Sequence, residues 1–417
     1  MKIEIINTGS ELLLGLVINT HLAFIGDSLF KLGLRVQRQV SIPDGEEIRH
    51  ALAEAMTRAD VIIVTGGLGP TTDDITCDIT AELLGRELKT DTAVLKHIEN
   101  IFSARGLELT APNLSQALIP EGGEALHNPK GTAPGIYLPA IEDHSPHIFL
   151  LPGPPRELIP MFKNEVAPRL VKLRDQQDSA QAGAQTYTNF KTIGIGESNL
   201  AHALDEEFAT LPDLEIGYCC RLGEVDVRLI GSPKDVEQGS SIIRKKYQRE
   251  IVTESEDPLE QIIVDLLTEK KQIISTAESC TGGLIASTLT DVSGSSAIFQ
   301  RAYITYANDA KAHMLGIPAQ LIEDHGAVSD ETVRAMAEGC LQKSDAHFAL
   351  AVSGIAGPTG GSEEKPVGTV YIALAEKNQP TFSNRFYFPL DRSSFKIRTT
   401  RAALDLLRQR LQGFELI

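Results

Sequence analysis

Residues 277–283, A-E-S-C-T-G-G, combine side chains that can do chemistry with glycines that let a chain turn sharply. The apolar run at 272–276 predicts a short buried strand, and 284–289 carries apolar residues at helical spacing. A polar turn between a strand and a helix places a serine and a cysteine where free backbone N–H groups converge. Such a turn can make a nucleophile or hold an anion, but Ser and Thr are also ordinary helix caps. Both interpretations stay open for this stretch alone.

Ser279 can attack an amide carbon only if another group accepts its proton. No His/Asp pair is evident near it, and Lys311 is the candidate base if burial lowers its pKa. Tyr306 could relay the proton or bind substrate, and the N–H groups after Ser279 would bind the oxyanion. Two alternatives remain. A lone lysine is normally a solvated helix residue, and Cys280 is a rival nucleophile because a thiol at a helix start has a depressed pKa.

A second glycine-rich turn, G-G-L-G-P-T-T-D-D-I-T at 66–76, follows the buried run 60–65. Backbone N–H groups in such a turn can cradle a phosphate, and the threonine hydroxyls can assist. The neighbouring Asp73 and Asp74 could hold a divalent metal through carboxylate oxygens. The structural alternative is a plain turn with Asp74 as the helix N-cap.

The elements that must position these turns are strands that alternate with helices, which predicts an α/β fold with parallel sheets. Ligands are expected at the carboxyl ends of such strands. The expected strands are residues 2–8, 34–40, 60–65, 187–193, 214–221, 224–230, 272–276, 297–304, 346–352 and 368–375. The expected helices include residues 22–32, 45–59, 197–207, 330–341 and 392–411. Residues 172–185 are polar and predict a linker, and 318–329 are expected to be a short connection.

The composition limits the class of protein. At 417 residues the chain exceeds one ordinary core, so two or three domains are expected. It contains no apolar run of about 18 residues that could span a membrane. Its five cysteines are scattered without a C-x-x-C pair, which argues against structural zinc and disulfides. A net charge of −17 and the lack of Trp disfavour direct nucleic-acid binding. We therefore expect a cytoplasmic globular protein.

The C-terminal motifs closely resemble the C-terminal domain of the CinA (competence/damage-inducible protein A) family. The matching stretches are 277–283, T-Y-A-N-D-A-K at 305–311 and V-S-G-I-A-G-P-T-G-G at 352–361. The resemblance implies an amidohydrolase that converts nicotinamide mononucleotide (NMN) to nicotinate mononucleotide and ammonia without a cofactor. It implies Ser279 as nucleophile, assisted by Tyr306 and Lys311. The substrate-binding residues would be Cys280, Thr281, Gly282, Gly283, Gly354, Gly357, Thr359 and Gly361.

The N-terminal motifs resemble the MoaB/MogA molybdopterin-binding fold and, more closely, the N-terminal domain of the CinA family. They are N-T-G-S-E-L-L-L-G at 7–15, T-G-G-L-G-P-T-T-D-D-I-T at 65–76, N-P-K-G-T-A-P-G at 128–135 and L-P-G-P-P-R-E-L at 151–158. The resemblance implies metal-dependent hydrolysis of the pyrophosphate in ADP-ribose. A divalent metal would neutralise the diphosphate and activate a water. Its ligands would be Asp44, Asp74 and Glu11, and the substrate would contact Gly66, Gly67, Gly69 and Thr71.

One position departs from the pattern of the N-terminal domain. His21 stands where the resemblance leads us to expect Asn, although a histidine there could still donate to a phosphate.

Residues 171–252 resemble the small KH-like middle domain of the same family. A KH domain that binds nucleic acid would carry a basic G-x-x-G loop, whereas the loop at 194–198 is acidic. We therefore expect a structural or dimer-forming spacer. The predicted domains are a MoaB/MogA-like three-layer domain at 1–170, the α+β KH-like domain at 171–252 and the α/β amidase domain at 253–417.

This resemblance predicts a homodimer that acts on NMN and ADP-ribose in pyridine-nucleotide salvage. Two alternatives stay open. In the first, the N-terminal domain only binds a pterin or a nucleotide. In the second, the chain is a non-enzymatic interaction protein connected with DNA uptake or repair.

Overall fold

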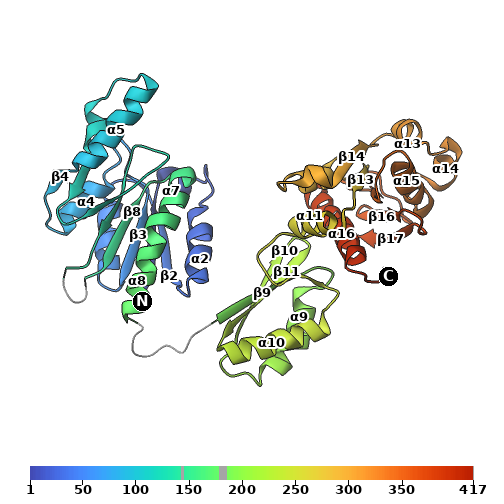
Figure 1. Ribbon diagram of the computed structural model, residues 1–417, viewed down its shortest axis with the longest axis horizontal. Coiled ribbons are helices and arrows are strands. Elements are labelled where there is room, and N and C mark those ends of the chain that lie inside the picture. The colour runs from blue at the N-terminus through green and yellow to red at the C-terminus, as the bar shows by residue number, and fades with distance from the viewer. Residues whose placement is uncertain (142–144, 178–185, 417) are drawn as a thin grey trace. The chain divides into compact units, whose positions relative to one another are not determined.

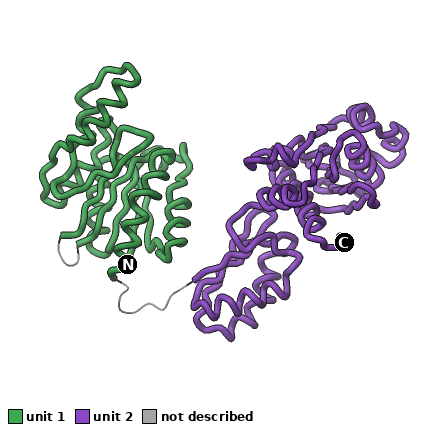
Figure 2. The backbone as a smooth tube through the Cα atoms, viewed as in Figure 1, with its two compact units in different colours: residues 1–183 green, residues 184–417 purple. Residues whose placement is uncertain are grey.

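The computed structural model describes residues 1–141, 145–177 and 186–416 and divides into two compact units, Met1–Gly183 and Ala184–Ile417 (Figure 2). Among these described residues, no helix combines the length and the apolar character needed to cross a lipid bilayer.

The first unit is a central sheet with helices on both faces (Figure 1). Its strand order is β2-β1-β3-β8-β7-β6, in which the first four strands are parallel and β7 and β6 are antiparallel to their neighbours. β3 (Val61–Thr65) is buried at every position because helices cover both of its sides. The predicted α/β fold with parallel strands is confirmed, and an antiparallel pair extends the sheet at one edge.

The strands of this unit are β1 (Ile3–Thr8), β2 (Val36–Ile42), β3, β4 (Leu88–Thr90), β5 (Leu118–Pro120), β6 (Glu124–Leu126), β7 (Gly135–Leu138) and β8 (His147–Leu151). The helices are α1 (Ser10–Leu13), α2 (His21–Lys31), α3 (Glu47–Met56), α4 (Thr76–Leu83), α5 (Thr92–Arg105), α6 (Ala111–Ser115), α7 (Pro155–Met161), the π-helical turn Phe162–Val166 and α8 (Ala167–Gln177).

The linker predicted to begin at residue 172 begins later. Residues 172–177 continue helix α8, because Leu170 is buried in the core of the first unit and Leu173 packs against it one turn further along. Arg174 also donates to the carbonyl oxygen of Leu32. The remainder of the predicted linker, 178–185, lies outside the described residues.

The second unit contains two sheets. The middle domain, from β9 to β12, is an antiparallel sheet of order β10-β11-β9-β12 whose apolar side packs against α9 and α10. Its elements are β9 (Thr186–Thr192), α9 (Glu197–Phe208), β10 (Glu215–Arg221), β11 (Glu224–Gly231), α10 (Pro233–Lys246) and β12 (Ile251–Thr253).

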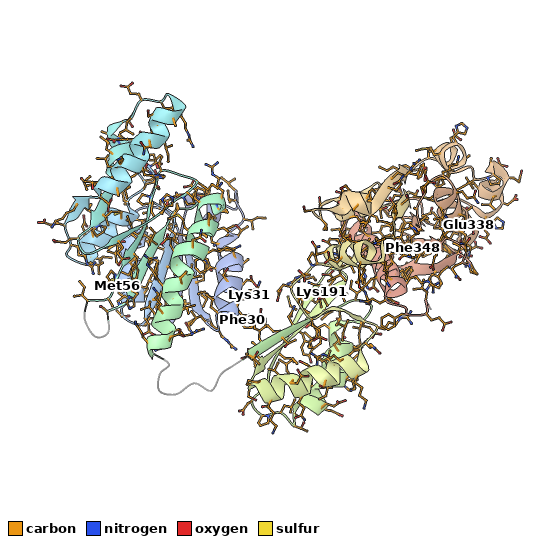
Figure 3. The ribbon with its side chains drawn as sticks, viewed as in Figure 1. Phe30, Lys31, Met56, Lys191, Glu338 and Phe348 are labelled. Atoms are coloured by element: carbon orange, nitrogen blue, oxygen red, sulfur yellow. The ribbon has the colours of Figure 1, made fainter. Side chains whose placement is uncertain are left out.

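The C-terminal domain has the strand order β14-β13-β15-β16-β17, with β14, β13 and β15 parallel and the last two antiparallel. Alternate residues of β15 face different helices. Phe348 (Figure 3) and Leu350 face one core, with α11, α12 and α16, whereas Ala349 faces the other, with α15. The elements are α11 (Leu259–Lys270), β13 (Ile274–Glu278), α12 (Leu284–Thr290), the 3₁₀ turn Ser295–Ala297, β14 (Phe299–Ile304), α13 (Asn308–Leu315), α14 (Ala319–His325), α15 (Asp330–Gln342), β15 (Phe348–Gly354), β16 (Thr369–Glu376), β17 (Phe382–Tyr387) and α16 (Arg392–Leu411).

Two features of this domain differ from the prediction. The expected connection at 318–329 contains helix α14, whose Ile322 packs into the same core as α15. Strand β17 was not expected from the sequence. It is an edge strand with no fully buried position, so it lacks the continuous apolar run that marks a central strand.

Helix α16 ties the middle domain to the C-terminal domain. Arg408 is fully buried on α16, forms an ion pair with Asp405 at 2.7 Å, and donates to the carbonyl oxygens of Arg249 and Ile251 at 2.7 and 2.9 Å. The two domains therefore share a buried polar contact along one helix.

A second charged contact lies next to this one. Arg401 of α16 lies 3.3 Å from Glu224 of β11, and Lys191 of β9 (Figure 3) lies 3.5 Å from Asp226. Lys191 and Asp226 both belong to the middle domain, whereas the Arg401–Glu224 pair joins the two domains. Because Glu224 is buried, its attraction to Arg401 favours one arrangement of the two domains.

Candidate functional site

The structure brings the predicted nucleophile and base together. Ser279 follows the last residue of β13, and its amide N–H donates to the carbonyl oxygen of Val352 at 3.1 Å. Lys311 comes from α13, and its Nζ donates to Ser279 Oγ at 3.2 Å. The same Nζ donates to the carbonyl oxygens of Thr305 and Tyr306 at 3.0 and 3.3 Å. A serine hydroxyl and a lysine amine therefore lie in direct contact.

The environment of Lys311 suits a base. Its side chain is only 1% exposed, and its hydrogen-bond partners are a hydroxyl and two carbonyl oxygens. Among the described residues, no carboxylate forms an ion pair with it. Burial lowers the pKa of the Lys311 ammonium from its ordinary value of 10.5, so the neutral amine is more populated than in an exposed lysine.

Glu278 is the organising residue of this turn, a role that no sequence pattern predicts. Its carboxylate is fully buried and accepts hydrogen bonds from the amides of Gly283, Ile285 and Ala286 at 2.9, 3.1 and 2.9 Å. The hydroxyl of Thr281 donates to it at 2.7 Å. The N–H groups of Gly283, Ile285 and Ala286 are therefore not free to bind a ligand, because Glu278 already accepts from them.

Cys280 is placed differently from Ser279. It is 5% exposed and packs in the hydrophobic core of the C-terminal domain, beside residues such as Ile285 and Val352. Burial raises the pKa of the Cys280 thiol to about 12, so the expectation of a depressed pKa is wrong. A thiol with so high a pKa is a poor nucleophile at neutral pH.

Tyr306 lies close to the pair through its backbone, whereas its side chain is engaged elsewhere. The side chain is 59% exposed, and its phenol oxygen accepts a hydrogen bond from Arg392 Nη2 at 2.6 Å. Arg392 also donates to the carbonyl oxygen of Gly357 at 2.9 Å. This arginine, the first residue of α16, links the predicted tyrosine to the predicted glycine loop. No sequence pattern predicts this contact, since a single arginine far along the chain carries no local signal.

The glycines predicted around Ser279 are required by the backbone conformation and close packing of the turns. Gly282 and Gly283 have φ of 63° and 98°, a region that favours glycine. Gly354 ends β15, where a Cβ would lie 2.8 Å from the carbonyl oxygen of Thr369. A Cβ on Gly357 or Gly361 would crowd Val367, while Thr359 is exposed. The loop is thus closely packed along one side and open at Thr359.

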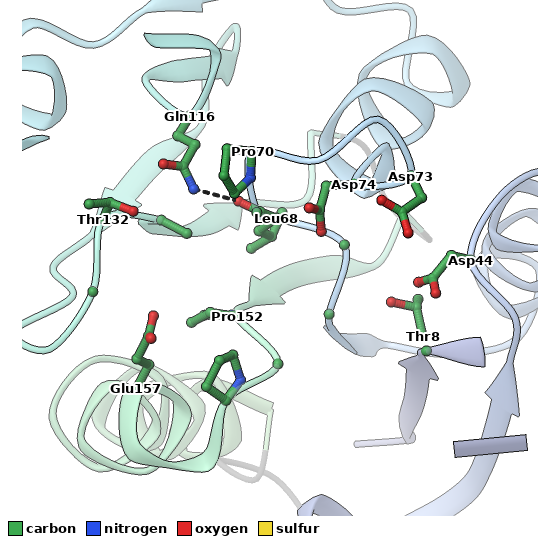
Figure 4. Close-up of a pocket in the computed structure, with 18 of the residues that line it drawn as sticks. Thr8, Asp44, Leu68, Pro70, Asp73, Asp74, Gln116, Thr132, Pro152 and Glu157 are labelled. Carbon is green, nitrogen blue, oxygen red and sulfur yellow. Dashed lines mark hydrogen bonds between the residues drawn. The ribbon is translucent and has the colours of Figure 1, made fainter. Parts of the chain in front are cut away.

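The first unit contains a pocket of about 460 Å³ at the carboxyl ends of its parallel strands. The predicted carboxylates Asp44, Asp74 and Glu11 line it, as do the predicted glycines Gly66, Gly67 and Gly69. Thr71, the fourth predicted substrate contact, is not part of the lining and donates to Asp74 instead. Figure 4 shows Asp44, Asp73 and Asp74 on one side of this pocket and Glu157 on the other. Glu157 was not predicted. It is 7% exposed and accepts from Asn128 at 2.9 Å.

The glycines of this pocket are required by close contacts. A Cβ on Gly66 would lie 2.6 Å from the carbonyl oxygen of Thr8, and one on Gly67 would lie 2.0 Å from Thr76 Oγ1. A Cβ on Gly69 would lie 2.5 Å from Asp74 Oδ2. The backbone of this turn can consequently approach a ligand closely.

The carboxylates partly fit a divalent metal. Asp44 accepts from the Ser10 amide at 3.0 Å, and Asp74 accepts from the Thr71 amide at 2.9 Å and from the Thr71 hydroxyl. In the described parts of the chain, no group of three or more His, Cys, Asp or Glu side chains could hold a metal ion by itself, so the prediction that Asp44, Asp74 and Glu11 together form a ligand set is wrong. Mg²⁺ commonly combines one or two carboxylates with water and substrate phosphate, and this donor set is of that type.

His21, the position that departs from the expected pattern, is engaged within the domain. Its Nδ1 lies 2.9 Å from the hydroxyl of Thr65, and burial lowers the pKa of the imidazole.

Comparison with known proteins identifies the families of the three domains. A family model described as "Probable molybdopterin binding domain" matches residues 4–172. The "Damage-inducible protein CinA KH domain" matches 188–255, and the "CinA C-terminal domain" matches 256–411. The chain is therefore an α/β protein with a MoaB/MogA-like domain, a KH-like domain and a CinA C-terminal domain in this order.

Individual relatives cover nearly the whole chain. A CinA-like protein of Akkermansia muciniphila is 43% identical over 97% of this chain and 96% of its own length. A CinA-like protein of Dictyoglomus thermophilum is 38% identical over 99% of both. A crystal structure of the competence/damage inducible protein CihA from Agrobacterium tumefaciens is 45% identical over 37% of this chain and 94% of its own, with a TM-score of 0.36. The chain belongs to the CinA family.

Replacing Glu278 by Gln should destabilise the C-terminal domain. The amide NH₂ cannot accept from the N–H groups of α12, so we expect a loss of about 1–3 kcal/mol and a fall of several degrees in that domain's unfolding temperature. Differential scanning calorimetry measures this. Glu376→Gln is the matched control, because Glu376 forms a partly exposed ion pair with Arg410. Equal unfolding temperatures for Glu278→Gln and the wild type would refute the assigned capping role.

Proposed function

We propose that this chain hydrolyses the carboxamide of nicotinamide mononucleotide at Ser279. One observation carries the proposal, namely the 3.2 Å contact between Ser279 Oγ and the Nζ of a buried lysine. The substrate class comes from the resemblance of residues 277–283, 305–311 and 352–361 to the CinA C-terminal domain, which the family match at 256–411 supports.

The chemistry follows from the pair. Neutral Lys311 takes the proton of the Ser279 hydroxyl while Oγ attacks the carboxamide carbon. The resulting lysine ammonium gives its proton to the leaving nitrogen, so that ammonia departs and an acyl-serine ester remains. Water, deprotonated by the same lysine, then hydrolyses the ester and restores the hydroxyl. The amide N–H groups of Cys280 and Thr281 are the proposed oxyanion donors, because Glu278 takes those of Gly283 and beyond.

The phosphate of the nucleotide would bind near Arg392. Its guanidinium already contacts Tyr306 and the loop carbonyl of Gly357, and the exposed Thr359 lies on the same loop. A guanidinium is the side chain best suited to a phosphate, so Arg392 would orient the ring amide toward Ser279.

For the N-terminal domain we propose hydrolysis of the pyrophosphate of ADP-ribose. The 460 Å³ pocket, with a close-packed glycine turn beside carboxylates, supports it. Asp44 and Asp74 would hold a divalent metal, which would supply charge neutralisation of the diphosphate. Both proposed substrates derive from breakdown of the same dinucleotide, so the two activities suit one cytoplasmic, homodimeric chain. A domain that only binds a pterin or nucleotide remains the rival proposal for this pocket.

Substitutions of Ser279 and Cys280 should show which of the two side chains is the nucleophile. We expect Ser279→Ala to reduce ammonia release from NMN by at least about a thousandfold, because the nucleophile is lost. Cys280→Ala should keep turnover, since that thiol packs in the core. Ammonia release by the purified full chain measures both. Full activity of Ser279→Ala would eliminate the serine mechanism, and an inactive wild type would favour the interaction-protein alternative.

The pH dependence of kcat/KM for NMN should follow the protonation state of Lys311. The rate should rise as the pH increases through the pKa of Lys311, with a midpoint below 10.5, because only the neutral amine accepts the serine proton. Lys311→Arg should lose about a hundredfold or more in kcat/KM at every pH, since a guanidinium stays protonated. The pH profile of kcat/KM for NMN tests this. A profile flat between pH 6 and about 10 would contradict lysine as the base.

The pyrophosphatase is tested by release of AMP from ADP-ribose with Mg²⁺. Asp74→Asn keeps the shape and the acceptor for Thr71 but removes the charge, so we expect a loss of about a hundredfold or more. Asp27→Asn is the control, because Asp27 forms an exposed ion pair with Lys31 on α2. If the wild type binds ADP-ribose without releasing AMP, the domain is a binding module.

A further inference from the structure

A pocket of about 400 Å³ lies between the middle and C-terminal domains, and neither proposed activity uses it. Ile193 and Arg249 line it from the middle domain, and Phe386, Phe388 and Arg398 line it from the C-terminal domain. Its volume falls in the range of about 300–1,000 Å³ typical of small-molecule sites, which often occur between domains. The position of this pocket is set by α16, which the buried Arg408 ties to the middle domain.

Two guanidinium groups give the pocket donors for an anion. Arg398 Nη1 donates to the carbonyl oxygen of Gly223 at 2.7 Å, and Arg249 Nε donates to Gln409 Oε1 at 2.8 Å. Within residues 186–416, the other guanidinium nitrogens of these two arginines have no hydrogen-bond partner. Burial also lowers the pKa of Arg398, which indicates that its charge is poorly hydrated. An oxyanion in the pocket would supply the missing acceptors.

The acidic groups of the lining leave this positive character largely intact. Asp405 forms an ion pair with Arg408 at 2.7 Å and accepts from Gln409 Nε2 at 2.7 Å. Its charge is thus largely shared with Arg408, although Asp405 and Glu224 still act on Arg398 and oppose the effect of burial on its pKa. Glu250 also lines the pocket, so the remaining lining charges are two guanidiniums and one carboxylate.

The apolar part of the lining contains two aromatic rings. Phe386 and Phe388 are stacked, with ring centroids 5.8 Å apart and an interplanar angle of 26°. The Arg398 guanidinium lies over the Phe388 ring, 5.3 Å from its centroid. Aromatic and guanidinium planes are the surfaces on which planar heterocycles stack.

We propose that this interdomain pocket binds a ring-bearing phosphate ester of mononucleotide size. The phosphate contacts the guanidiniums of Arg249 and Arg398, and the planar ring packs against Phe386 and Ile193. This site is separate from Ser279 and from the pocket of the first unit, so it stands whether or not the proposed activities are correct.

The chain contains no tryptophan, which allows a local reporter. Phe386→Trp places the only indole of the full-length protein in the lining of the pocket. Titration with AMP should give a saturable change in tryptophan fluorescence with a midpoint below 1 mM (about −4 kcal/mol). Adenosine and inorganic phosphate, titrated separately, should each bind about tenfold more weakly, because each supplies only half of the contacts.

Arginine variants test whether the fluorescence change comes from AMP bound in this pocket. In the Phe386→Trp background, Arg398→Met and Arg249→Met should each weaken AMP binding by about tenfold or more. Arg385→Met is the matched control. Arg385 also lies over an aromatic ring, that of Tyr371, and donates to a backbone carbonyl, but it is outside the lining. Its removal should leave the midpoint unchanged.

A second measurement avoids the reporter substitution. Equilibrium dialysis of AMP against the wild-type chain should show one binding site more than against Arg398→Met, and Arg385→Met should match the wild type. Either no saturable fluorescence change with AMP, or equal numbers of sites in the wild type and Arg398→Met, would overturn the proposal.

Discussion

The structure around Ser279 depends on one buried carboxylate. Glu278 is fully buried, and among the described residues no lysine or arginine forms an ion pair with it. Its charge is compensated by amide N–H groups of α12 and by the Thr281 hydroxyl. A buried charge is costly unless it is hydrogen-bonded in this way, and the positive end of a helix adds to the compensation. Because Glu278 ends β13 and its donors begin α12, the carboxylate holds the strand and the helix together across Ser279.

This arrangement explains how Lys311 can be buried without an acidic partner. Glu278 lies in the same motif, but its oxygens are already committed to α12, so the ammonium is left with Ser279 and two carbonyl groups. Carbonyl dipoles favour the charged form, whereas removal from water disfavours it. Desolvation is the larger effect and lowers the pKa. An available carboxylate would raise the pKa instead and hold the lysine as an ammonium. The helix cap therefore also sets the electrostatics of the base.

Helix α16 connects this site with the rest of the second unit. Its first residue, Arg392, contacts Tyr306, and its buried Arg408 contacts the backbone of the middle domain. Between them lies Arg398, in the lining of the interdomain pocket. A helix of 20 residues is about 30 Å long, so one continuous element carries both Arg392 and Arg408. Whatever fixes α16 against the middle domain also restrains the arginine beside the proposed amidase site.

Local patterns in the sequence predict the alternating elements, including both ends of α16, and motifs predict that Ser279 and Lys311 belong to one site. They do not predict where adjacent side chains point. Ser279 contacts a lysine amine while Cys280 enters the core, and this difference of one residue reverses the expected pKa of the thiol. Arg392 contacts a residue 86 positions away, a distance over which periodicity carries no information. Residue types therefore identify the chemistry that a turn can support, but burial decides which of its side chains can perform it.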